Sequence, residues 1–392
     1  MNADDVMEDE AERLASVLVD KGVLSAEWMG PYAAARRDLF IPDVIWPGRV
    51  EGSGQGESID RREDPDAWFR AVYSDVSLTT QWDDGKHTGR GKGRVPTCSV
   101  SQPSMVFSML KDLDVRREHR VLEIGTGMGW CAGLLSERAG DESVFSVEFD
   151  PNNARSARRH VAGAGYKPTL IFGDGSLGYL PGAPYDRVLF TASLLDFPPD
   201  VIRQCREDTI IVAPYSTTYG GGANVGLKVG GDGHASGKFA GSSAFMRLRQ
   251  QRGVWPGTDV YLRGQKWPAA GVRRMTSLNP DDVGAWATMF VIGLQTRGFA
   301  PWMESYGDGS YTLWLRDRAV KSWATVDFIP EAEAFEVYQS GHRELWTEVE
   351  TAYAWWTGQG KPGPDRFGMT VKPMREATYW LDSPGHPVPV IV

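Results

Sequence analysis

The chain has 392 residues, of which 41% are hydrophobic and 24% charged, a composition typical of a folded globular protein. Its length exceeds that of a typical single core, so we expect two domains. The formal net charge of -9 argues against general nucleic-acid binding, which depends on clustered Lys and Arg. No apolar run approaches the length of a membrane span, and the acidic start MNADDVMEDE is unlike a secretory signal, so we expect a cytoplasmic protein that does not bind membranes.

Metal and disulfide chemistry is not expected. The three cysteines lie far apart and form no C-x-x-C pair, and the six histidines include no pair at the spacing of a metal-binding helix. The sequence therefore predicts no metal site.

The N-terminal part predicts helices that cap a sheet domain. Leu14, Val17 and Leu18 recur at helical spacing, and the pattern ends before Pro42. Two Gly-rich runs follow, GRVEGSGQG at 48–56 and DDGKHTGRGKG at 83–93, and both are typical of loops.

The run SVSQPSMVFSML predicts a helix that begins near Pro103, because the apolar positions after this proline recur at helical spacing as far as Leu110. Ser101 therefore lies next to the amino end of that helix. Ser101 or Gln102 could simply cap the helix, or could belong to a reactive site. The local sequence is consistent with both.

The run VLEIGTGMGW predicts a buried strand that turns into a helix through three alternating glycines, Gly125, Gly127 and Gly129. A ligand could approach such a backbone closely. Glu148 follows about twenty residues later, at the end of the next apolar strand, where a carboxylate could accept hydrogen bonds from a ribose. The alternatives are a tight turn without a ligand and a solvated glutamate at a strand end.

Glu123 lies within this motif and disfavours a pyrophosphate, which prefers neutral or basic surroundings. A carboxylate suits a cationic ligand better. The pattern E-x-G-x-G-x-G resembles the first motif of class I S-adenosylmethionine-dependent methyltransferases.

Strands and helices alternate regularly after the glycine motif, which predicts an α/β fold with a mostly parallel sheet and helices on both faces. The segments Thr209 to Ala213 and Ala244 to Arg249 are expected to extend this sheet. The first domain is expected to span 1–252.

The amino-acid composition changes after Arg252, because ten of the fifteen tryptophans lie beyond this residue. We expect an additional α+β domain over 253–392 whose tryptophans are mostly core. Helices are expected over 281–295 and 344–356, and strands over 311–315 and 325–328.

Several ordered motifs together resemble the protein-L-isoaspartate O-methyltransferase family over roughly residues 30 to 250. The matching motifs are Tyr73-Ser74-Asp75, Leu78-Thr79, Val100-Ser101-Gln102-Pro103, the glycine motif, Gly173-Asp174-Gly175, GYLPGAPYDRVLFTAS and VAPYST. The resemblance implies a Rossmann-like class I methyltransferase fold and S-adenosyl-L-methionine as cofactor.

The resemblance also implies roles for particular residues. It assigns Ser101 as the catalytic hydroxyl beside the transferred methyl group, and Asp75 and Gln102 to substrate binding. It assigns cofactor binding to Glu123, Gly125, Thr126, Gly127, Glu148, Phe149, Asp174 and Gly175. Asp174 could instead only form a turn before Gly175.

Three functions remain open from the sequence. The tail motifs RFGMTV and WLDSP resemble family members that esterify an aspartate of a cyclised ribosomal peptide (a lanthipeptide, lasso or ATP-grasp-crosslinked precursor) and so lead to aspartimide or isoaspartate. That function is the first hypothesis, with the modified precursor peptide as partner, and with the insertion at 83–96 and the C-terminal domain expected to recognise this peptide. The second is general isoaspartate repair, and the third is a cofactor-binding scaffold without turnover. The sequence does not determine the oligomeric state.

Overall fold

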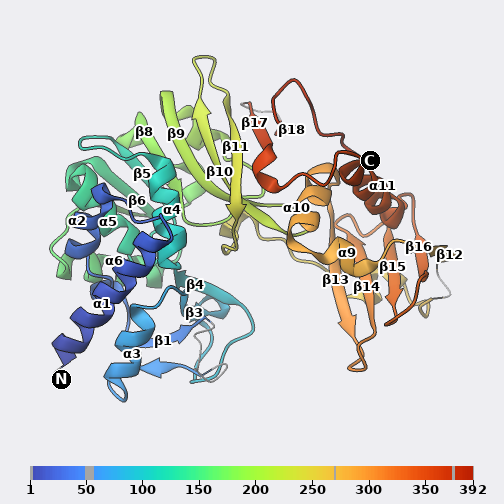
Figure 1. Cartoon of the computed structure of the whole chain (residues 1–392), viewed down its shortest axis with the longest axis horizontal. Helices are drawn as coiled ribbons and strands as arrows, with labels where there is room; N and C mark the ends of the chain where they lie inside the picture. The colour runs from blue at the N-terminus through green and yellow to red at the C-terminus, as the bar shows by residue number, and fades with distance from the viewer. Residues whose placement is uncertain (1–2, 49–56, 269–270, 373–375, 392) are drawn as a thin grey trace.

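The computed structural model describes residues 3–48, 57–268, 271–372 and 376–391 (Figure 1). Three sheets organise this part of the chain: a central sheet of nine strands, a four-stranded sheet near the N-terminus and a five-stranded sheet near the C-terminus. The predicted loop at 48–56 lies almost entirely outside the described residues.

The nine-stranded sheet has the strand order β18-β17-β11-β10-β9-β8-β5-β6-β7. Its strands are β5 (Val121–Ile124), β6 (Val144–Glu148), β7 (Thr169–Phe172), β8 (Tyr185–Phe190), β9 (Cys205–Ser216), β10 (Gly222–Val229), β11 (Ala235–Ser242), β17 (Phe367–Val371) and β18 (Thr378–Leu381). The strands from β7 to β9 pair in parallel, and the pairings from β9 to β18 are antiparallel. The parallel half confirms the α/β prediction.

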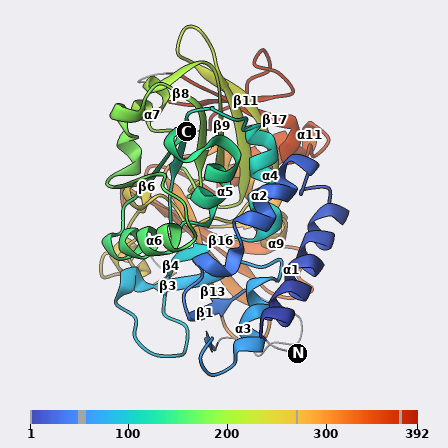
Figure 2. The same cartoon turned by 90° about the vertical axis from the view of Figure 1, so that its left-hand side faces the viewer.

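Helices cover both faces of this sheet. Successive side chains of a strand point to opposite faces, and apolar residues at successive positions therefore predict a covering layer on each face. In β5, Val121 packs with α2, α4 and α5 on one face, whereas Leu122 packs on the opposite face with α7 and α10. Figure 2 shows the first of these faces. The helices before residue 252 are α1 (Ala3–Asp20), α2 (Ala26–Ala34), α3 (Pro65–Val72), α4 (Pro103–Leu113), α5 (Trp130–Ala139), α6 (Pro151–Gly163) and α7 (Pro199–Arg203).

One predicted strand is wrong. The segment from Ala244 to Arg249 does not form a strand, and only Arg247 makes an isolated bridge, to Ser193. The hairpin of β10 and β11 extends the sheet instead. Gly237 packs directly on the backbone of Gly226, so tight strand pairing requires small residues there.

The small N-terminal sheet has the order β2-β1-β3-β4 and is antiparallel. Its strands are β1 (Val44–Pro47), β2 (Ile59–Asp60), β3 (Leu78–Trp82) and β4 (Pro96–Val100). The Gly-rich run at 83–93 connects β3 to β4 and begins with the 3-10 helix η2 (Asp83–Gly85). The predicted loop is therefore the tip of a hairpin, and β4 leads directly into Ser101.

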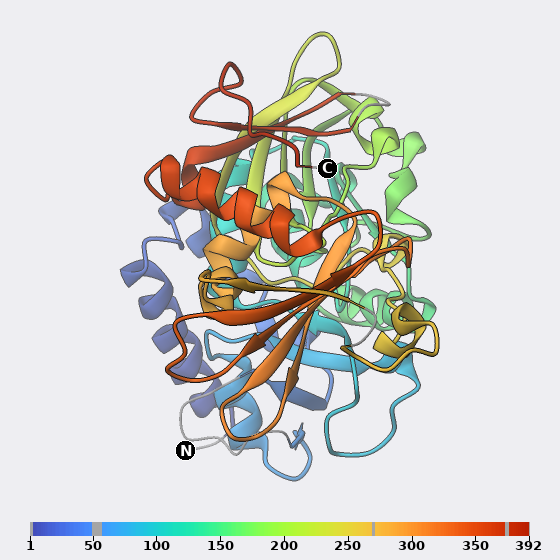
Figure 3. The ribbon, with the colours of Figure 1, turned by 90° about the vertical axis from the view of Figure 1, so that its right-hand side faces the viewer.

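The C-terminal sheet is antiparallel, in the order β12-β16-β15-β14-β13, and α11 lies across it (Figure 3). Its strands are β12 (Val272–Thr276), β13 (Phe299–Ser305), β14 (Tyr311–Asp317), β15 (Trp323–Phe328) and β16 (Phe335–Ser340). Its helices are α8 (Thr258–Leu262), α9 (Pro280–Gly284), α10 (Trp286–Gln295) and α11 (Leu345–Gly358). The helix expected over 281–295 is thus interrupted at Ala285, which has extended backbone angles.

The end of the chain differs from the expected division at residue 252. After α11 the chain returns to the first sheet, where β17 pairs with β11 and β18 pairs with β17 (Figure 1). The last two strands therefore belong to the nine-stranded sheet and not to the C-terminal one. Five of the ten C-terminal tryptophans are buried, namely Trp314, Trp323, Trp346, Trp356 and Trp380.

None of the helices in the described ranges is both long and apolar enough to traverse a bilayer. Over the same ranges, no group of three or more His, Cys, Asp or Glu side chains is placed to hold a metal ion.

Candidate active site

A cavity of about 1070 Å³ opens at the carboxyl ends of the parallel strands. The strand order places β5 and β8 side by side next to the cavity. From β5 the sheet continues to β6 and β7, and from β8 it continues to β9 on the opposite side. This point of an open α/β sheet is where ligands bind, because loops from the two halves diverge there. The volume is at the upper end of the range for small-molecule pockets, which leaves room for two ligands.

The glycine motif forms one wall of the cavity, and its three glycines have positive φ angles. A Cβ atom on Gly125 would lie 2.4 Å from Thr191 Oγ1, and one on Gly129 would lie 2.5 Å from Val161 Cγ2. These two glycines are needed for packing. At Gly127 a Cβ atom would make only ordinary van der Waals contacts, the nearest at 3.7 Å, so the positive φ angle, and not packing, favours glycine there.

Glu148 ends β6 and lies in the cavity wall beside Gly127. Its carboxylate accepts hydrogen bonds from the backbone N–H groups of Gly127 and Asp150, each at 2.8 Å. Burial raises the pKa of this carboxyl, although both N–H groups oppose the shift. The hydrogen bonds fix the carboxylate at the loop, with lone pairs left for a hydroxyl ligand.

Glu123 and Thr126 lie behind the loop and do not line the cavity. The Glu123 side chain is fully buried and accepts a hydrogen bond from the hydroxyl of Ser146, which also bonds Thr126 Oγ1. Burial raises the pKa of Glu123 to about 8. This shift favours the neutral acid, and Glu123 does not line the cavity, so its assignment to a cationic ligand stays a prediction.

Ser101 and Gln102 line the cavity at the amino end of α4. The side chain of neither residue caps the helix, which removes the purely structural alternative. The Ser101 carbonyl accepts a hydrogen bond of 2.9 Å from Arg37, a fully buried arginine that also binds the carbonyls of residues 72, 74 and 76. No described residue hydrogen-bonds the Ser101 hydroxyl, which is available to a ligand.

Asp75, expected at the substrate entrance, does not line the cavity. It accepts a hydrogen bond from the backbone N–H of Ser104 and pairs with Lys21, so it anchors the first turn of α4. Asp174 caps its own turn by accepting hydrogen bonds from the N–H and hydroxyl of Ser176, and only Gly175 reaches the cavity wall.

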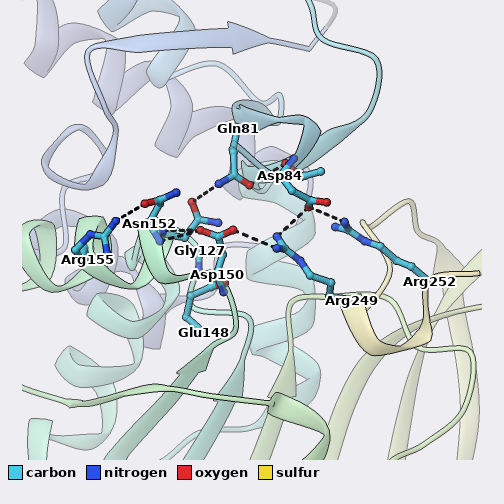
Figure 4. Close-up of polar contacts among 11 residues, drawn as sticks. Gln81, Asp84, Gly127, Glu148, Asp150, Asn152, Arg155, Arg249 and Arg252 are labelled. Atoms are coloured by element: carbon cyan, nitrogen blue, oxygen red, sulfur yellow. Dashed lines mark hydrogen bonds and ion pairs between the residues drawn. The ribbon is translucent and has the colours of Figure 1, made fainter. Parts of the chain in front are cut away.

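Phe149 is exposed and has the guanidinium of Arg249 5.4 Å from its ring centre. Arg249 also pairs with Asp150 and Asp84, and Arg252 pairs with Asp84 (Figure 4). This network joins the tip of the β3–β4 hairpin to the 3-10 helix η6 (Arg249–Gln251) at the rim of the cavity.

The segment at 242–252 is the main part of the site that sequence reasoning missed. It supplies nine or more lining residues, including Arg247, Arg249 and Arg252. The signal was three arginines within six residues directly after the sheet, but the segment was assigned to a strand. Trp286 of α10 also lines the cavity, so the C-terminal part of the chain contributes to its wall.

Comparisons with known proteins agree with this arrangement. Residues 57–251 match the family model described as Protein-L-isoaspartate(D-aspartate) O-methyltransferase (PCMT). The chain is 42% identical over 122 residues to protein-L-isoaspartate O-methyltransferase 1 of Archaeoglobus fulgidus, covering 31% of this chain and 56% of the relative. It is 43% identical over 117 residues to the protein-L-isoaspartate O-methyltransferase of Methanoculleus marisnigri, covering 30% and 52%. The chain thus spans about half the length of these curated relatives.

A solved structure named protein-L-isoaspartate O-methyltransferase is similar over 97% of this chain and 100% of its own, with a TM-score of 0.52 and 19% identity. This similarity shows a shared fold. It extends beyond the methyltransferase-like part and includes the C-terminal region.

Proposed function

We propose, from the match of residues 57–251 to the protein-L-isoaspartate O-methyltransferase family model, that this chain is a carboxyl O-methyltransferase that uses S-adenosyl-L-methionine to esterify isoaspartyl residues of peptides or proteins. The observation that carries the proposal is the shared cavity. Gly127, Glu148 and the hydroxyl of Ser101 line one space at the switch point of the sheet.

The residues present fit the nucleoside end of this cofactor. Gly127 brings its backbone to the cavity wall without a side chain, and Glu148 offers oxygen acceptors for ribose hydroxyls. Phe149 and Gly175 lie beyond them and offer an exposed ring and a bare backbone to the base. When bound, the cofactor supplies an electrophilic methyl group on a sulfonium centre.

The acceptor needs little activation from the protein, because a carboxylate is ionised at neutral pH. The residues of the site must instead orient it and exclude water. The hydroxyl of Ser101 can donate one hydrogen bond to the carboxylate, which aligns the other oxygen for attack. Arg37 holds the Ser101 backbone in place by its bond to the carbonyl.

The test is a methyl-transfer assay. The full chain is mixed with the methyl donor and two synthetic peptides that differ only in carrying isoaspartate or aspartate at one position. We expect a gain of one methyl group on the isoaspartyl peptide alone, seen by mass spectrometry. Tight donor binding without any methylated product would instead favour the scaffold hypothesis.

The second candidate is the narrower function, esterification of an aspartate in a cyclised ribosomal peptide. It is favoured by the size of the cavity and by Trp286, which brings the C-terminal part to the cavity wall. The C-terminal part is by itself weak support, because a solved structure named for isoaspartate methylation has the same fold over 97% of this chain. A cyclised precursor that is methylated at aspartate, when its linear form is not, would favour the second candidate.

A further inference from the structure

Four charged side chains line the cavity: Glu148, Arg247, Arg249 and Arg252. Three of them have partners that account for their charge. Glu148 accepts two backbone N–H groups, and Arg249 and Arg252 form ion pairs with Asp84. Arg247 differs, because no acidic side chain of the described ranges lies within ion-pair distance of it.

Arg247 is held in place by neutral groups. Its backbone forms a bridge to Ser193 at the end of β8, and its Nη2 donates hydrogen bonds to Ser216 Oγ at 2.9 Å and to the Thr217 carbonyl at 3.1 Å. The Nε and Nη1 groups have no partner among the described residues, yet they are not sealed from solvent. Burial lowers the pKa of Arg247, although Tyr215 and the carboxylate of Asp196, which forms no ion pair with it, oppose the shift. A fixed guanidinium therefore presents free N–H groups in a cavity wall.

The strand order places Arg247 away from the nucleoside end of the cavity. Its partner Ser216 ends β9, which lies three strands from β6 and Glu148 in the order β9-β8-β5-β6. At about 4.8 Å per strand, this separation is roughly 14 Å. Gly127 and the start of α5 follow β5 and so lie between Arg247 and Glu148. Arg247 is thus on the side of the cavity that remains for the methyl acceptor.

We propose that Arg247 binds the substrate carboxylate that accepts the methyl group, and so makes the site selective for a free acid. This inference rests on the proposed function. The free Nη1 group of Arg247 can donate a charge-assisted hydrogen bond to one oxygen of the carboxylate, while Ser101 supplies a further hydrogen bond. Methylation converts the anion into a neutral ester, so the ion pair is lost and the product binds more weakly than the substrate.

The experiment measures binding with S-adenosylhomocysteine present. The probes are one isoaspartyl peptide without other acidic groups, and the same peptide with the acceptor carboxylate replaced by a carboxamide. We expect the wild-type protein to prefer the carboxylate peptide by about 10- to 100-fold, the range of a charge-assisted hydrogen-bond pair. Arg247→Met should remove most of this preference, raise the KM for the peptide, and keep the affinity for S-adenosylhomocysteine within about twofold.

Two further variants sharpen the result. Arg252→Met removes an equal charge from the rim, where Asp84 already neutralises it, and should retain the carboxylate preference. Arg247→Lys keeps a charge without the planar, fixed N–H geometry of the guanidinium and should retain part of the preference, which guards against misfolding of the methionine variant.

An unchanged carboxylate preference in both Arg247 variants would overturn the inference. So would a parallel loss of S-adenosylhomocysteine affinity, which would assign Arg247 to the cofactor's own carboxylate. A wild-type protein that prefers the carboxylate peptide but never methylates it would contradict the proposed function while supporting carboxylate binding by Arg247.

Discussion

At the scale of single residues, the Ser101 hydroxyl is the group closest to the proposed chemistry. Ser101→Ala should lower kcat/KM for an isoaspartyl peptide by about 10- to 100-fold, because one hydrogen bond to a charged acceptor is lost. Cofactor affinity should be unchanged, since Gly127 and Glu148 remain. Steady-state kinetics and calorimetry with S-adenosylhomocysteine measure the two effects. Ser108→Ala, on the same helix but outside the cavity wall, is the matched control.

If Ser101→Ala weakens cofactor binding as much as methyl transfer, Ser101 belongs to the cofactor site and is not the residue that orients the acceptor. The same outcome in Ser108→Ala would indicate a general disturbance of α4.

Glu123 predicts a pH dependence of stability. Its folded-state pKa is about 8, against a usual value near 4.5, because the side chain is fully buried. Between these values the unfolded chain releases a proton that the folded chain retains, so the free energy of unfolding should fall as pH rises, by up to ~1.4 kcal/mol per pH unit. Glu123→Gln cannot ionise and should lack this decline.

Thermal unfolding at pH 5 and pH 8 checks this. The gain in Tm of Glu123→Gln over wild type should be larger at pH 8 than at pH 5. Glu142→Gln, at an exposed position, should follow the wild type at both values. Equal differences at the two pH values would show that Glu123 is already ionised in the folded protein.

The residues that the sequence predicted well are those whose role follows from the backbone. Gly125, Gly127 and Glu148 were predicted because a strand, a turn and a second strand end have fixed spacing. The cofactor role of Glu123 stays a prediction, since the same spacing does not reveal that its side chain is buried and outside the cavity wall. The local signal for Arg247 was only the cluster of three arginines at 247–252, because its place depends on contacts with β9 and with the segment after β8.

At the scale of elements, the hairpin of β3 and β4 is tied to η6 by the ion pairs around Asp84. Arg249→Met should weaken S-adenosylhomocysteine binding by about 3- to 10-fold, because it removes partly exposed ion pairs and the contact with Phe149. Arg252→Met removes one ion pair and should cost less than about threefold. Calorimetry at low and high salt checks both, and high salt should shrink the difference between wild type and each variant.

An equal effect of the two variants would contradict a specific role of the Phe149 contact. If neither variant weakens S-adenosylhomocysteine binding, the ion-pair network only joins the β3–β4 hairpin to η6.

The predicted elements were most accurate where periodicity was strong. The helices around Pro103 and 344–356 and the strands after the glycine motif are present close to their expected bounds. The hairpin of β10 and β11 was missed because its glycines lower the apparent strand propensity, although they permit the close pairing of the two strands. Ala285 likewise interrupts a helix through its backbone angles, a feature that apolar spacing does not show.

At the scale of the whole molecule, the C-terminal part is integrated with the first sheet. Phe290 of α10 packs against Phe239 of β11 with ring centres 4.9 Å apart, and Met369 of β17 is fully buried in the same core. The chain therefore crosses between the two sheets before and after the C-terminal region. A boundary at residue 252 could be inferred from composition, but the return of β17 and β18 could not, because strand pairing over more than 120 residues leaves no local pattern.

This integration changes what a truncation can test. A chain that ends at Arg252 loses β17, β18 and α10, so it should expose the core around Phe239 and leave β11 as an unpaired edge. We expect aggregation or loss of cooperative unfolding, measured by circular dichroism, and not a soluble enzyme with altered peptide selection. Undiminished Tm and activity in the truncated chain would contradict this.

Peptide selection by the C-terminal part is better tested inside the intact chain. Trp286 lines the cavity, is 42% exposed, and donates its indole N–H to the Gly222 carbonyl. Trp286→Ala should keep a cooperative unfolding transition and raise the KM for a long or cyclised peptide more than for a short isoaspartyl peptide, because only the larger substrates reach this wall. Trp302→Ala removes a tryptophan that is 55% exposed and lies outside the cavity wall, and it is the control. Equal KM changes for all peptides would assign Trp286 to packing alone. The C-terminal part would then support the sheet and would not contribute to substrate recognition.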